Sequence, residues 1–155
     1  MKAISWCKKR TKGIKLIQPN NNLSEEYYKN AEESLMVLRA IKETQSKVWL
    51  ATTKYYLQYF AAYAIFMKLG IKCEIHDCTI TLLKLIENDL KISGFSKMLN
   101  DSKGLRIDNQ YYLKNRPVAI NLDELSDFLI ATNSCLRQLH PEMINNVREK
   151  VKKLK

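Results

Sequence analysis

Glycine and proline are scarce in this chain, at 4 and 3 of its 155 residues. Sandwiches and barrels connect many short strands through turns that rely on these two residues, so their scarcity disfavours both architectures. No internal repeat and no strand-like alternation of polar and apolar residues is visible. Lysine, leucine and isoleucine are the commonest residues instead, glutamate and alanine are also frequent, and this composition favours long helices.

The sequence also lacks the signals of a secreted or membrane protein. No apolar region follows the basic residues 8–10, so we expect no secretion signal. The run Trp49–Leu69 is long enough to cross a bilayer, but Lys54 and Gln58 would be costly in lipid. We therefore expect no membrane span and a cytoplasmic location, in which the four cysteines would be reduced thiols.

The run Trp49–Leu69 organises the expected fold. It is apolar on nearly every side except for a narrow polar stripe that includes Gln58, as is typical of a helix surrounded by other helices. We expect an all-α fold, an antiparallel bundle of about five helices over residues 22–140. A basic irregular arm, residues 1–21, should precede the bundle, and a basic helical tail, residues 141–155, should follow it.

Local signals place the ends of the first two helices. Asn22 or Ser24 can cap a helix that runs to about Gln45. The second helix begins at about Ser46 and should end at Gly70, because glycine favours the left-handed conformation that closes many helices.

The later helices have weaker boundaries. Asp77 can cap a third helix that fades by about Leu90. Segment 91–104 contains serine and glycine, so we expect a loop with one short helical turn. A fourth helix should cover residues 105–113, and Asn121 opens a capping-box pattern for the fifth.

Two stretches carry a resemblance to a known family. Residues 55–77 read YYLQYFAAYAIFMKLGIKCEIHD, a tyrosine- and alanine-rich helix that ends in Leu-Gly and is followed by a loop and His76. This stretch resembles the core signature of the HEPN superfamily. Residues 106–111, RIDNQY, are similar to the later segment of that family, in which a tyrosine follows an arginine. The resemblance covers about residues 24–137.

The resemblance implies an antiparallel helical bundle, commonly dimeric, with a role connected to nucleotides or RNA. Many HEPN proteins pair with a small nucleotidyltransferase in toxin–antitoxin-like modules. Ribonuclease members carry a histidine after the arginine, whereas residues 110–113 here read Gln-Tyr-Tyr-Leu. We therefore expect a homodimer that binds RNA, a nucleotide or a nucleotidyltransferase without catalysis and without a cofactor.

Arg106 is the main candidate for a functional site. A guanidinium can hold a phosphate through two parallel hydrogen bonds. Helical spacing brings Asn109 and Gln110 near the face of Arg106 and leaves Tyr111 at its side. The alternative interpretation is an ion pair between Arg106 and Asp108 or another carboxylate.

A histidine elsewhere in the chain could replace the missing one. His76, beside Asp77 at a helix start, could orient a ligand or serve as a base, or it could simply be a structural hydrogen-bonding residue. His140 shares a helix face with Arg137. The alternative function is therefore a metal-independent ribonuclease that uses Arg106 with a displaced histidine.

Two other residue patterns have structural as well as functional interpretations. The spacing of Cys73, His76 and Cys78 invites a zinc interpretation, with Cys7 or Cys135 as a further ligand, but it matches no familiar knuckle. We expect buried thiols and no metal.

The tyrosines of the central helix could stack nucleic-acid bases, although at their helical spacing they more often fill a core or an interface. They are Tyr55, Tyr56, Tyr59 and Tyr63.

Charge points to an acidic partner. The net charge is +10 and the pI is near 9.4, which suggests that the partner is nucleic acid, a nucleotide, an acidic protein or an anionic membrane face. The alternative is a soluble protein with a lysine-rich surface. Because basic residues cluster in the arm and the tail, we expect these segments to bracket the bundle and to bind RNA mainly by charge.

Overall fold

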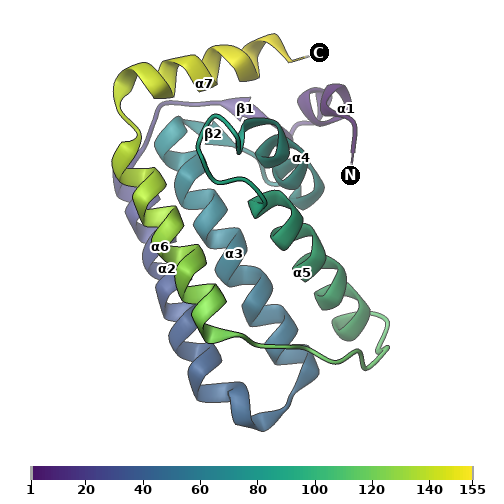
Figure 1. The fold of residues 1–155 in the computed structure, drawn as a ribbon. Coiled ribbons are helices and arrows are strands. Elements are labelled where there is room, and N and C mark those ends of the chain that lie inside the picture. The colour runs from purple at the N-terminus through teal and green to yellow at the C-terminus, as the bar shows by residue number, and fades with distance from the viewer. Residues whose placement is uncertain (1, 155) are drawn as a thin grey trace.

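The computed structural model describes residues 2–154 and confirms the all-α class (Figure 1). Within these residues it contains seven α-helices, more than the five or so that the sequence predicted, together with one short 3₁₀-helix and a two-stranded sheet. Four long helices lie along the main axis: α2 (Asn21–Ile41), α3 (Lys47–Leu69), α5 (Phe95–Gln110) and α6 (Leu122–Gln138). The 3₁₀-helix, Lys42–Thr44, follows α2.

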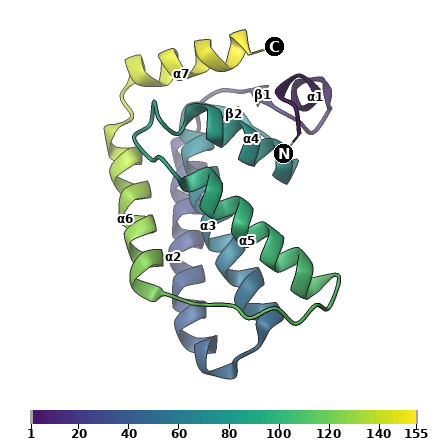
Figure 2. The ribbon, with the colours of Figure 1, turned by 45° about the vertical axis from the view of Figure 1, so that its right-hand side comes forward.

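The remaining elements gather at one end of the long helices, with α7 lying across that end (Figure 2). They are α1 (Ile4–Lys9), β1 (Lys15–Leu16), β2 (Ile71–Lys72), α4 (His76–Ile86) and α7 (Pro141–Lys153). The strands are antiparallel, with Lys15 opposite Lys72 and Leu16 opposite Ile71.

Helix α3 is the centre of the core, as its apolar sequence predicted. Most of its side chains are buried, among them Tyr55, Leu57 and Phe66. Two residues differ from the prediction: Trp49 is 64% exposed, whereas Gln58 is only 1% exposed. The Gln58 Oε1 atom has no hydrogen-bond partner within residues 2–154. None of the helices in this part of the chain has the length and apolar character that a bilayer crossing needs.

Several predicted helix ends are confirmed. Gly70 closes α3 with a left-handed φ of 69°, and its N–H donates to the carbonyl groups of Phe66 and Met67. Asn121 caps α6 by accepting a hydrogen bond from the Glu124 N–H at 3.1 Å.

The cap of α2 was placed wrongly. The capping residue is Asn20, whose Oδ1 accepts from the Leu23 N–H at 2.9 Å. Asn22 lies inside the helix. Ser24 is buried, and its hydroxyl donates to the Ala64 carbonyl at 2.6 Å, so it joins α2 to α3 instead of capping.

The prediction of a loop with one short helical turn over residues 91–104 holds only for residues 91–94, because α5 begins at Phe95 and runs without a break through Ser102 and Gly104. The helix start is held by the Glu87 carboxylate, which accepts from the Ser96 N–H at 2.9 Å. Buried Leu99 packs into the core, and such burial outweighs the roughly 1 kcal/mol helix cost of one glycine. The predicted fourth helix is therefore the second half of α5.

The basic arm is not irregular, because it contains α1 and β1. It also does not bracket the bundle with the tail. Lys8 Nζ donates to the carbonyl groups of Lys152 at 3.0 Å and Leu154 at 2.6 Å, so the arm caps the last turn of α7. Both terminal segments consequently lie at the same end of the molecule (Figure 1).

A disulfide joins Cys7 of α1 to Cys78 of α4. The expectation of four reduced thiols was therefore wrong for this pair, while Cys73 and Cys135 are free and buried. Spacing did not reveal the bond, because its two cysteines are 71 residues apart in sequence.

Candidate anion-binding site

Two of the functional residues predicted from sequence, His76 and Arg106, meet at the aromatic face of α3. Tyr55 and Tyr59 lie one turn apart on this helix, and their rings stack at a centroid distance of 5.8 Å. His76, the first residue of α4, and Arg106, in the second half of α5, both contact the Tyr55 ring. Three helices therefore build one site.

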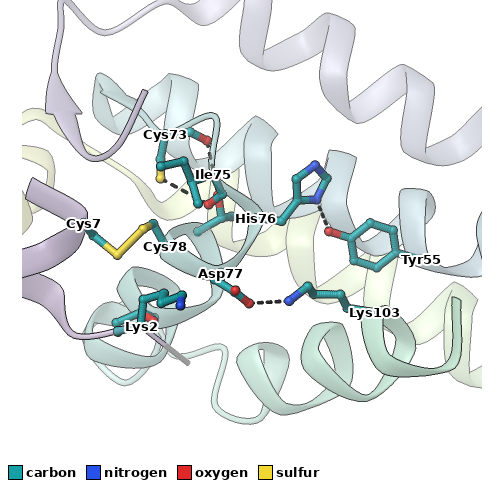
Figure 3. Close-up of polar contacts among 11 residues, drawn as sticks. Lys2, Cys7, Tyr55, Cys73, Ile75, His76, Asp77, Cys78 and Lys103 are labelled. Carbon is teal, nitrogen blue, oxygen red and sulfur yellow. Dashed lines mark hydrogen bonds and ion pairs between the residues drawn. A yellow bond between two sulfur atoms is a disulfide. The ribbon is translucent and has the colours of Figure 1, made fainter. Parts of the chain in front are cut away.

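His76 is held between its neighbours. Its ring stacks on Tyr59 at 4.4 Å with an interplanar angle of 17°, and Nδ1 is hydrogen-bonded to the Tyr55 hydroxyl (Figure 3). Burial lowers the pKa of His76, and the positive charges of Arg106 and Lys103 lower it further. The imidazole is therefore neutral at pH 7.

Tyr55 is held in its protonated form. Burial raises its pKa far above the ordinary value of 10, although the charge of Arg106 opposes the shift. A protonated hydroxyl can donate to Nδ1 of a neutral histidine, and the ring hydrogen of His76 then lies on Nε2. In that arrangement, neither Nδ1 of His76 nor the phenol oxygen of Tyr55 readily accepts a further proton.

The Arg106 side chain lies over two tyrosine rings of α3 and forms hydrogen bonds with residues at the C-terminal end of α5. Its guanidinium carbon is 4.9 Å from the centre of the Tyr55 ring and 5.2 Å from that of Tyr56. Nε donates to Gln110 Oε1 at 3.0 Å, and Nη2 donates to the Tyr111 hydroxyl at 3.2 Å. The bond to Gln110 has the predicted i, i+4 helical spacing, and the bond to Tyr111 forms at the residue that ends α5.

The alternative interpretation of Arg106, an ion pair with Asp108, does not match the structure. Asp108 pairs instead with Lys114 at 2.8 Å and Arg116 at 2.6 Å, and these partners lower its pKa. Within residues 2–154, Arg106 forms no ion pair with any carboxylate, and its side-chain hydrogen bonds go to an amide and to tyrosine hydroxyls. The guanidinium thus keeps donors for a ligand.

Asn109, the other predicted ligand residue on α5, has a structural contact. It is buried, and its Oδ1 accepts from the Arg116 N–H at 2.6 Å while its Nδ2 donates to the Arg116 carbonyl at 3.2 Å. The amide therefore holds the connection between α5 and α6. Its polar atoms are already used in this way, so the site consists of Arg106, Tyr111 and His76 without Asn109.

Spacing along the chain did not reveal the ion pair beside the site. Lys103 of α5 pairs with Asp77 of α4, and the hydrogen bond from Lys103 is the main reason that the pKa of Asp77 is lowered (Figure 3). The two residues are 26 positions apart, on different helices. The pair fixes the start of α4, and with it His76, against α5.

The zinc interpretation of the nearby cysteines loses one of its ligands. Cys78 is bonded to Cys7, so it offers no thiolate. Cys73 is buried, and its Sγ lies 3.6 Å from the Ile75 carbonyl oxygen. Within residues 2–154, no group of three or more metal-binding side chains is assembled.

Neither a scan against models of known protein families nor a search of curated proteins finds a match to this chain. The resemblance to the HEPN superfamily stays a prediction, based on residues 55–77 and 106–111. The geometry of the structure supports the site itself, in which a charged arginine lies on an aromatic face beside a neutral histidine.

Proposed function

We propose that this chain is a HEPN-like helical module that binds RNA or a nucleotide through a phosphate at Arg106, without chemistry of its own. The observation that carries the proposal is the setting of the Arg106 guanidinium. It is partly exposed, unpaired with any carboxylate in the described chain, and lies against the rings of Tyr55 and Tyr56. A guanidinium held in this way is pre-organised for bidentate contact with a phosphate.

Exposed aromatic side chains beside the arginine support a nucleotide as the ligand. Tyr111 and Tyr112 are 62% and 66% exposed, at the end of α5. The Arg106 guanidinium lies 5.8 Å from the Tyr111 ring centre, and Lys114 Nζ lies 5.4 Å from that of Tyr112. Such rings can stack a base while the neighbouring cations contact its phosphate.

The absence of a suitable proton carrier supports binding without cleavage. RNA cleavage through the 2′-hydroxyl needs a group that exchanges a proton near neutral pH. The pKa of Tyr55 is raised and that of His76 is lowered, and Nδ1 of His76 is already engaged. Where ribonuclease members of the HEPN superfamily carry a histidine after the arginine, residues 110–113 here read Gln-Tyr-Tyr-Leu.

One observation favours the alternative function, a metal-independent ribonuclease. Arg106 and His76 contact the same Tyr55 ring, so a cation and a histidine lie close together. The second histidine considered from sequence, His140, caps α7 at the end of the bundle, where its Nδ1 accepts from the Met143 N–H at 3.4 Å. A ribonuclease mechanism would therefore use His76.

Two further elements of the proposal concern partners. We propose a homodimer and, following the resemblance, a nucleotidyltransferase as a partner protein. The tyrosines of α3 are mostly buried within one chain and no longer argue for a dimer. Exposed apolar side chains on α2 and α3 support it instead, namely Met36, Val37 and Trp49.

Binding and cleavage can be tested on the same samples. Fluorescence anisotropy with a labelled single-stranded RNA and with ATP analogues should show that Arg106→Ala weakens binding about tenfold or more, the loss expected for charge-assisted hydrogen bonds. Arg39→Ala removes an exposed arginine of α2 and is the matched control. Gel analysis should find the RNA intact. Cleavage by the wild type that disappears in both Arg106→Ala and His76→Ala would support the ribonuclease instead.

A further inference from the structure

The positive charge of this chain is concentrated in its two terminal segments. Residues 1–24 contain six lysines and arginines and no acidic residue. Residues 25–140 contain 15 basic and 14 acidic residues, so the bundle itself is nearly neutral. The net charge of +10 therefore comes almost entirely from the arm and the tail.

The fold joins these two segments into one surface. Lys8 of α1 donates to the carbonyl groups at the C-terminal end of α7, and the Cys7–Cys78 disulfide holds α1 against α4. Figures 1 and 2 both place α1, β1 and the last turns of α7 at the same end of the molecule. We name residues 2–16 and 148–154 the basic end.

Many cations of the basic end are free to meet a ligand. Lys9, Lys12, Lys15 and Lys153 are exposed, and within the described chain their ammonium groups make no hydrogen bond or ion pair. Among them, Lys12 lies near the Glu74 carboxylate and helps to lower its pKa, but Glu74 forms its ion pair with Lys72. Like charges held close together repel one another, and a polyanion that neutralised them would relieve this repulsion.

The apolar side chains at this end are not arranged for a membrane. Val147 and Val151, on the apolar face of α7, are buried against the bundle. Trp6 is partly buried, with Arg10 and Lys2 over its ring at 4.4 and 5.4 Å. An amphipathic helix that binds a bilayer must insert its apolar face, and α7 cannot do so while it is packed in this way.

We infer that the basic end binds the sugar–phosphate backbone of a nucleic acid by charge, without reading its sequence. This surface shares no residue with the Arg106 site and would act in addition to it. Lysines are suited to the task, because each ammonium acts as a mobile point charge toward phosphates. Binding through several such contacts releases counterions and should depend steeply on salt.

The test compares two triple variants that lose the same charge at different places. Lys9→Gln, Lys12→Gln and Lys153→Gln remove free cations of the basic end. The control, Lys29→Gln, Arg39→Gln and Lys42→Gln, removes three exposed cations from α2 and the turn after it. Binding to labelled RNA duplexes of two unrelated sequences is measured by anisotropy across a salt series, and circular dichroism checks that both variants are folded.

We expect the basic-end variant to lose affinity about tenfold or more for both duplexes, and its salt slope to fall by about two to three, roughly one per phosphate contact removed. The control should change affinity less than about threefold. Equal losses in the two variants, or no loss in the first, would overturn the inference, as would preferential binding to phosphatidylserine vesicles. Arg106→Ala, measured in parallel, tests the Arg106 site separately.

Discussion

At the scale of single residues, two glycines differ in whether a side chain could replace their hydrogen: Gly70 has no room for one, and Gly104 has. Gly70 has a φ of 69°, and a Cβ there would overlap Arg148 Nη1 and lie 2.5 Å from the Ile17 carbonyl oxygen. Gly104 lies within α5 and has nothing within 4 Å of an added Cβ. We predict that Gly70→Ala lowers the free energy of unfolding by about 2 kcal/mol or more, from left-handed strain plus overlap.

Gly104→Ala is the matched control for that prediction and should act in the opposite direction. Alanine is a better helix former than glycine, so this variant should gain about 0.5–1 kcal/mol. Urea denaturation of both variants measures the difference. Similar shifts for the two would contradict the role assigned to the Gly70 conformation.

His76 predicts a specific dependence of stability on pH. Its pKa in the folded chain is lowered by burial and by Arg106 and Lys103, relative to about 6.5 in the unfolded chain. The unfolded chain therefore binds the proton first as the pH falls. The corresponding stability is complete above about pH 6.5 and is lost as the pH falls toward the folded-state pKa.

The measurement is the urea midpoint of the wild type and of His76→Gln between pH 7.5 and 5. The wild-type midpoint should fall over this range, and the fall should be smaller in His76→Gln. His140→Asn, which replaces an exposed helix-capping histidine by another capping residue, controls for loss of a histidine. An equal fall in His76→Gln would show that other groups cause the dependence.

The candidate site was predictable within one helix but not between helices. The contact from Arg106 to Gln110 follows from a spacing of four residues along α5, whereas the contact to Tyr111 forms at the residue just after the end of that helix. The hydrogen bond from Tyr55 to His76 depends on how α3 and α4 pack, and no spacing in the sequence encodes it. Asn109 lies on the predicted helix, but its side-chain amide is hydrogen-bonded to the backbone of Arg116 and is not part of the site.

At the scale of elements, the disulfide between α1 and α4 yields a stability prediction. A bond that closes a loop across 71 positions restricts the unfolded chain and should contribute about 4 kcal/mol in the chain-entropy account. The double variant Cys7→Ser, Cys78→Ser should therefore unfold at a much lower urea concentration than the oxidised wild type. Reductant should shift the wild type in the same direction and leave the variant unchanged.

Counting thiols provides an independent check of the same bond. The unfolded wild type should titrate as two free thiols without reductant, Cys73 and Cys135, and as four after reduction. Four thiols in fresh, non-reduced protein would mean that the disulfide is absent in solution.

Elements were predictable where local signals agreed with packing. The apolar run of α3 identified a buried helix, and Gly70 marked where that helix ends. Asn121 likewise marked the start of α6. The errors arose where tertiary contacts decide the outcome. Segment 91–104 has the composition of a loop, yet burial of Leu99 and the Glu87 cap make residues 95–104 part of α5.

At the scale of the whole molecule, the sequence indicated the charge but not its distribution in space. The arm and the tail were expected on either side of the bundle, and the fold places them together. A contact such as Lys8 to Leu154 joins residues 146 positions apart, which no local pattern predicts. Collecting the cations at one end makes the molecule electrically asymmetric, with a nearly neutral bundle behind a basic end.

The last prediction concerns assembly. We predict a homodimer whose interface lies where α2 and α3 expose large apolar side chains, because Met36, Val37 and Trp49 are between 46% and 66% exposed. Sedimentation at micromolar concentration should give about twice the 18.1 kDa chain mass. Trp49→Lys places a charge in this interface and should yield monomers, whereas Ile130→Lys, at an exposed apolar residue of α6, should not. A monomeric wild type would contradict the dimer, and a dimer lost only in Ile130→Lys would move the interface to α6.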